Sequence, residues 1–121
     1  MDTNTISISN RVVFLDETRG FSRFFKAKFS WISNVERYFK IKDFVAITVN
    51  ETDILFIVMT TPNDFMFYTG YANKVKYVFI YMDYKDIVIE QKLKNNIFLI
   101  DMNWLKQDVV NYIRKCTENI N

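Results

Sequence analysis

The sequence predicts a single α+β domain with a mainly antiparallel sheet of about five to six strands, an amphipathic helix at about 22–40 and a C-terminal helix at about 103–117. Three observations lead to this fold class. A chain of 121 residues is long enough for one domain, 1–121, and too short for two ordinary ones. Half of it is hydrophobic and 17% is aromatic, which indicates a buried core. Short apolar runs lie between two amphipathic segments.

The first amphipathic segment, 22–40, favours a helix. At 100° per residue most of its apolar side chains fall on one face and its Ser, Lys and Arg side chains on the other. Lys28 is the exception, because it projects into the apolar arc. Residues 25–31 also alternate strictly between apolar and polar, as a strand paired with residues 11–16 would. We favour the helix, which explains more residues, and keep the strand as the alternative.

The second helix is predicted by an apolar stripe on residues 103–117, with Asp101 or Asn103 as its N-cap. The stripe consists of Leu105, Val109, Tyr112, Ile113 and Cys116. We expect Cys116 to be a buried small hydrophobe within it.

The strands are predicted from apolar or alternating runs. "DFVAITV" and "ILFIVMT" are separated by the turn formers "NETD", which indicates a hairpin, and the second run is apolar on both faces, as in a central strand. The other runs are "RVVFLD", "DFMFYTGY", "KVKYVFIYM", "DIVIEQK" and "NIFLID". Tyr77 and Tyr81 have the same strand parity and are expected on one sheet face, while Trp31 and Trp104 are expected to be core anchors.

Composition excludes several chemistries. The chain has no histidine and one cysteine, so Ser-His and Cys-His nucleophiles, an internal disulfide and an intrachain thiolate zinc site are excluded. Gly20 and Gly70 lie too far apart for a phosphate-binding glycine loop. We therefore expect no cofactor and no metal.

The N-terminus and the apolar runs lead to an expectation about location. Residues 1–9 do not have a signal-peptide pattern and are expected to form a flexible tail. The longest apolar runs are far shorter than the ~20 residues of a membrane helix. We expect a cytoplasmic protein without a membrane partner.

One arrangement of carboxylates resembles a nuclease signature. "TPND", which ends at Asp64, is followed by Glu90-Gln91-Lys92 at the end of a predicted strand. This resembles the divided acid and Glu-x-Lys signature of PD-(D/E)XK nucleases. The resemblance implies that Asp64 and Glu90 would hold Mg²⁺ and that Lys92 would orient the attacking water. A nuclease is therefore one alternative function.

Positive charge is concentrated in one segment. Residues 19–42 carry seven basic side chains and one acid, whereas the whole chain has a net charge of +2. On the predicted helix the candidate binding residues Arg23, Lys26, Arg37 and Lys40 form one positive stripe. The stripe fits an acidic protein surface, the phosphates of a nucleic acid, or an ordinary solvated face.

The function predicted from these observations is a non-catalytic protein-binding module, of the inhibitor, immunity or accessory type found in phages, viruses and mobile elements. The reasons are the lack of a complete catalytic motif, the small size, and a composition in which about half the residues have A- and T-rich codons. The alternatives are a nucleic-acid-binding module that uses the basic stripe and the nuclease described above. Homodimerisation is an open alternative, because the chain is rich in aromatic side chains.

Overall fold

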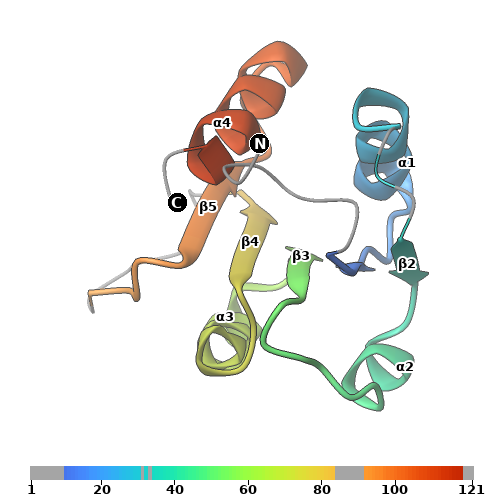
Figure 1. Cartoon of the computed structure of the whole chain (residues 1–121), viewed down its shortest axis with the longest axis vertical. Helices are drawn as coiled ribbons and strands as arrows, with labels where there is room; N and C mark the ends of the chain where they lie inside the picture. Colours follow the sequence, from blue (N-terminus) through green and yellow to red (C-terminus); the bar gives the residue numbers. More distant parts are fainter. Residues whose placement is uncertain (1–9, 31, 33, 84–91, 119–121) are drawn as a thin grey trace.

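The fold is a parallel sheet with helices on both faces (Figure 1). The computed structural model describes residues 10–30, 32, 34–83 and 92–118. Within them one sheet has the order β2-β1-β3-β4-β5, and every pair of neighbours is parallel. The strands are β1 (Val12–Leu15), β2 (Val35–Tyr38), β3 (Ile54–Val58), β4 (Tyr77–Met82) and β5 (Ile97–Asp101). The helices are α1 (Gly20–Lys28), α2 (Ile41–Val45), α3 (Phe65–Thr69) and α4 (Lys106–Glu118), with 3₁₀ turns η1 (Pro62–Asp64) and η2 (Gly70–Asn73).

The strand order decides which face each helix covers. The chain passes from β1 outward to β2 and then returns across β1 to β3, so its direction along the sheet reverses. Right-handed crossovers then place α1 on one face and α2 and α3 on the other. Figure 1 shows this arrangement, with α4 on the same side as α1. This is the doubly wound, flavodoxin-like strand order, in which ligands bind outside the carboxyl ends of the strands.

The expected antiparallel sheet is therefore wrong. β1 and β3 are buried along their full length, because helices cover both of their faces. Such strands are continuous apolar runs in parallel sheets. The expected hairpin at "NETD" is also wrong, since the run before it contains α2, and α2 is part of a crossover. The prediction that "ILFIVMT" supplies a central strand is confirmed by β3.

The single helix expected at 22–40 is replaced by α1 and β2. Helix α1 ends at Lys28, where Phe29 leaves the helical region and its N–H donates to the carbonyl of Phe25. Lys28 is exposed in the last turn, a position where a cation also interacts favourably with the helix dipole. The strand alternative for 25–31 is wrong as well, since its first four residues are helical.

The predicted strand "DFMFYTGY" is wrong, whereas the predicted C-terminal helix is confirmed. "DFMFYTGY" forms α3 and η2 instead of a strand, and it buries Phe65 and Tyr68 against the sheet. The C-terminal helix is confirmed as α4, which begins three residues later than expected. The strand predicted at "DIVIEQK" lies outside the described residues except for Lys92.

The core on the α1/α4 face contains a ladder of phenylalanines. The parallel register places Phe14, Phe56, Phe79 and Phe98 on adjacent strands. Their ring centroids are 5.0, 4.5 and 5.0 Å apart in that order. Phe25 of α1 packs onto this ladder 4.8 Å from Phe56, which fixes α1 over β1 and β3.

Candidate binding groove between α1 and α4

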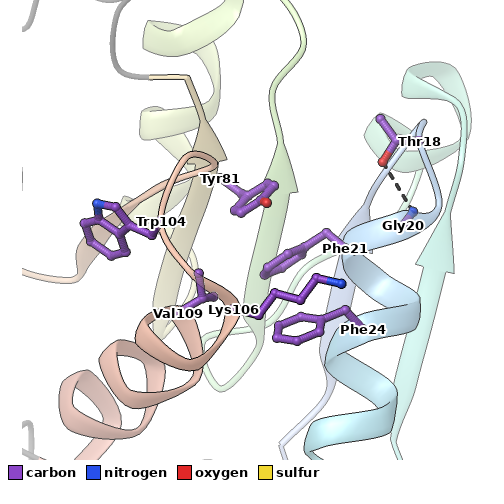
Figure 2. Close-up of a pocket in the computed structure, with 8 residues that line it drawn as sticks. All are labelled: Thr18, Gly20, Phe21, Phe24, Tyr81, Trp104, Lys106 and Val109. Atoms are coloured by element: carbon purple, nitrogen blue, oxygen red, sulfur yellow. Dashed lines mark hydrogen bonds between the residues drawn. The ribbon is translucent and has the colours of Figure 1, made fainter.

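A pocket of about 310 Å³ opens between α1 and α4 at the carboxyl edge of the sheet. Its size is at the lower end of the range for small ligand-binding pockets. It is lined by Thr18, Gly20, Phe21, Phe24, Tyr81, Trp104, Lys106 and Val109. Figure 2 shows Phe21 and Phe24 projecting from α1 toward α4, with the Lys106 side chain extending between the helices. We call this region the α1–α4 groove.

Stacked rings form the inner wall of the groove. The Phe21 ring lies 4.3 Å from that of Tyr81 at an interplanar angle of 24°, which links α1 to β4. Phe21 is buried, whereas Tyr81 and Phe24 are half-buried. Burial, aided by the charges of Asp16 and Asp101, raises the pKa of the Tyr81 hydroxyl above its usual range. The wall is therefore apolar with one phenolic hydroxyl.

The outer end of the groove exposes two large hydrophobic side chains. Trp104 is 36% exposed and Leu105 is 74% exposed, in the turn that joins β5 to α4. The turn is held by the Asp101 carboxylate, whose Oδ1 accepts hydrogen bonds from both the backbone N–H and the side-chain amide of Asn103. The expectation that Trp104 anchors the core is wrong: the centroid of its ring lies 5.2 Å from that of Tyr112, and its side chain is exposed.

Lys106 lines the groove, and two further cations, Arg114 and Lys28, lie farther along α4 and α1. Lys106 Nζ lies 5.7 Å from the centre of the Phe24 ring, and Arg114 Cζ lies 5.7 Å from that of Phe29. Lys106 and Arg114 are eight residues apart and so occupy the same side of α4. Lys28 is exposed and follows Phe24 by four residues, which places it on the same side of α1. The groove thus combines aromatic walls with positive charge.

A buried carboxylate fixes the end of α1 that borders the groove. Asp16, fully buried after β1, accepts hydrogen bonds from the backbone N–H of Ser22 at 2.8 Å and from that of Thr18 at 3.1 Å. It therefore satisfies one of the N–H groups that a helix leaves unpaired at its N-terminus. The residue before the helix, Arg19, has φ 65°, which is rare for a residue other than glycine. Asp16 in this way positions Phe21 and Phe24.

The four residues expected to form one stripe lie on three elements. Arg23 and Lys26 are exposed on α1, Arg37 is half-buried on β2, and Lys40 is exposed just before α2. Arg37 reaches the beginning of α1, where its Nε donates to Ser22 Oγ at 2.9 Å. The four residues therefore do not form a stripe on one helix, because Arg37 lies on β2, the outer strand of the sheet.

The structure describes two of the three residues expected for a nuclease site, Asp64 and Lys92. Asp64 ends η1, beyond the carboxyl end of β3, while Lys92 precedes the amino end of β5. In a parallel sheet the carboxyl ends of all strands lie on one side and the amino ends on the other, so Asp64 and Lys92 lie at opposite ends of the strands. Glu90 lies outside the described residues. The described part of the chain contains no group of three or more Asp, Glu or Cys side chains that could hold a metal ion.

Sequence reasoning missed most of the groove. Phe24, Tyr81 and Lys106 are distant in sequence, and only the parallel topology brings them together. The exposed pair Trp104 and Leu105 gave no detectable signal, since adjacent apolar residues can both face the core, as Val109 and Val110 do in α4. Among the described residues no helix has the length and apolar character needed to cross a membrane.

The fold and the groove define a class: a small doubly wound parallel α/β domain with an aromatic, lysine-bearing pocket at the carboxyl edge of its sheet. Comparison with protein-family models, with curated proteins and with solved structures gives no significant match. The side chains of the α1–α4 groove are therefore the basis for the function proposed below.

Proposed function

We propose that this chain is a non-catalytic binding module that takes up a segment of a protein partner in the α1–α4 groove. The observation that carries the proposal is the pocket itself, in which the half-buried Phe24 and the exposed Trp104 line the same cavity as Lys106. Pockets of this kind hold the few anchor side chains that dominate protein–protein affinity. An inhibitor, immunity or accessory role, as the composition suggested, is part of this proposal.

The charges along the groove favour an acidic partner segment. The cationic groups of Lys106 and Arg114 lie near aromatic rings, and Lys28 adds a third positive charge on the facing helix. An apolar anchor flanked by Asp or Glu would fill the pocket and meet these cations. Complementary charge of this kind raises association rates and selects among partners.

The test uses a displayed library of random peptides. We expect the native chain to enrich sequences in which a Trp, Leu or Phe is flanked by Asp or Glu, and the matching synthetic peptide to change the fluorescence of Trp104. Phe24→Ala and Lys106→Glu should each reduce the affinity at least about tenfold, because the first removes a pocket wall and the second reverses its charge.

Met66→Ala is the matched control, since Met66 is 57% exposed on α3, on the opposite face of the sheet. It should bind the selected peptide as the native chain does. Enrichment that is the same for the native and Lys106→Glu chains, or retention of an oligonucleotide in place of acidic peptides, would contradict the proposal.

A further inference from the structure

A second surface, at the β2 edge of the sheet, combines two arginines with one aromatic ring. Arg19 Cζ lies 4.0 Å and Arg37 Cζ 5.1 Å from the centre of the Phe39 ring. Arg19 precedes α1, Arg37 belongs to β2, and Phe39 directly follows β2. The carboxyl end of β2 and the beginning of α1 therefore bring the two guanidinium groups to one ring.

Arg37 is held in place by hydrogen bonds to the beginning of α1. Its Nε donates to Ser22 Oγ at 2.9 Å and its Nη2 to the carbonyl oxygen of Arg19 at 3.4 Å. Ser22 is fully buried, and its own backbone N–H is bonded to Asp16. The orientation of Arg37 is thus set by a rigid part of the protein.

The two arginines lack acidic partners in the described structure. The ion pairs found there join Arg11 to Asp53 and to Glu36, and neither Arg19 nor Arg37 takes part in one. Glu36 belongs to the other face of β2, where it accepts a hydrogen bond from Tyr38. Two positive charges therefore lie at one ring, and no carboxylate of the described residues is ion-paired with either of them. These like charges repel one another unless an anion is bound between them.

We propose that Arg19 and Arg37 bind a phosphate group. A guanidinium that stacks on a ring uses its flat face and leaves its in-plane N–H groups able to donate. Arg37 bonds Ser22 and Arg19 with one N–H each from Nε and Nη2, so the two N–H groups of Nη1 and one of Nη2 remain, and a pair of such donors matches the spacing of phosphate oxygens. Two such groups suit a tetrahedral dianion better than a carboxylate, which carries a single charge. This site is separate from the α1–α4 groove and does not depend on the function proposed for it.

The experiment titrates the native chain with inorganic phosphate, phenyl phosphate and acetate at constant ionic strength, following backbone amide resonances by NMR. Both phosphates should shift the amides of Arg19, Ser22 and Phe39, and acetate should bind at least about tenfold more weakly. Tighter binding of phenyl phosphate would identify an ester as the ligand, whereas equal affinities would identify the free anion.

Variants separate a built site from general attraction by positive charge. Arg37→Ala should weaken phosphate binding about tenfold or more, and Arg37→Lys should not restore it, because lysine lacks the planar fork. Lys94→Ala removes the same charge on the far side of the sheet, where Lys94 bonds to Asn73, and should leave the affinity unchanged.

Arg19→Gly is a second variant that removes one guanidinium while glycine accepts the positive φ at this position. It should also bind phosphate at least severalfold more weakly. Equal phosphate affinity in the native, Arg37→Ala and Arg19→Gly chains, or acetate binding as tight as phosphate binding, would overturn the proposal.

Discussion

The rings of Phe56 and Phe79 stack across β3 and β4 with their centroids 4.5 Å apart and their planes within 7° of parallel. The pairing follows directly from the parallel register, which places the two residues opposite each other. Both rings are almost fully buried between the sheet and α1 and α4. This contact lies at the centre of the phenylalanine ladder.

Phe56→Ala is expected to lower the free energy of unfolding by about 3–5 kcal/mol, because it leaves a cavity in the middle of the ladder. Phe56→Leu should cost less, since most of the volume is retained. Urea denaturation followed by circular dichroism measures both values. Phe67→Ala is the control, because Phe67 is 56% exposed on α3. A similar loss for Phe67 and Phe56 would contradict the assignment of the ladder to the core.

Asp53→Ala should destabilise the chain by about 1–3 kcal/mol, because Arg11 is partly exposed and keeps Glu36 and the Thr48 carbonyl as partners. Asp53 is buried and accepts bonds from Arg11 Nε at 3.2 Å, from Arg11 Nη2 at 2.5 Å and from the backbone N–H of Asn50 at 2.8 Å. Its removal leaves the guanidinium without its main partner. Replacing both residues, Arg11→Met with Asp53→Leu, should recover part of the loss in the same denaturation experiment. A double variant less stable than Asp53→Ala would contradict the explanation that the loss comes from leaving the Arg11 guanidinium without its main partner.

Asp16→Ala should destabilise α1 by about 1–2 kcal/mol or more, because the N–H groups of Ser22 and Thr18 lose their acceptor. Hydrogen exchange at residues 20–25 should accelerate, while exchange in β4 should change less. Asp16→Asn keeps one acceptor oxygen and should show a smaller effect. Equal acceleration in α1 and β4 would indicate global unfolding instead of a lost helix cap.

The stability of the chain should fall as the pH rises from 10 to 12. Burial, aided by the charge of Asp64, raises the pKa of Tyr68 from 10.0 to about 12. Above pH 10 the unfolded chain loses this proton while the folded chain retains it, so its stabilising effect is present below pH 10 and is lost as the pH approaches 12. The loss attributable to Tyr68 should be about 2–3 kcal/mol.

Denaturation of the native chain and of Tyr68→Phe at several alkaline pH values tests this expectation. The variant should have a shallower decline, although not a flat one, because burial also raises the pKa values of Tyr71 and Tyr77. Identical slopes would show that Tyr68 titrates normally in the folded chain.

Arg19→Gly should be more stable than Arg19→Ala by about 1 kcal/mol. The φ of 65° at this position strains any residue with a Cβ atom, and glycine does not have this strain. Both variants lose the same contact with Phe39, so their difference reports the backbone alone. Thermal unfolding measures it, and an alanine variant as stable as the glycine variant would contradict the assigned backbone geometry.

The local elements with strong patterns were predictable. The apolar runs that became β1, β3, β4 and β5 were recognised, and so was most of the stripe of α4; its expected first member, Leu105, instead lies before α4 and is 74% exposed. The shared face of Tyr77 and Tyr81 is also confirmed, since both pack in the core under α1 and α4. Each of these depends on the hydrophobicity of a few consecutive residues, which a sequence shows directly.

The pairing of the strands was not predictable in the same way. Helices α2 and α3 are five residues each, too short to show a helical period, and both were interpreted as strands. Without those two helices as crossovers, neighbouring strands were assigned to hairpins and the sheet to the wrong class. The residues of α1 and β2 were predicted to form one helix, because Val35 and Phe39 fit the helical period of α1.

The sequence by itself determined the apolar runs that form β1, β3, β4 and β5, the excluded histidine and thiolate chemistry, and the concentration of positive charge in residues 19–42. Only the tertiary structure decided that the strands are parallel, that Phe24 and Lys106 line one groove, and that Arg19 and Arg37 meet at Phe39. The physical reason is that hydrophobic burial depends on local pattern, whereas strand order depends on crossovers, and these bring together residues far apart in the chain.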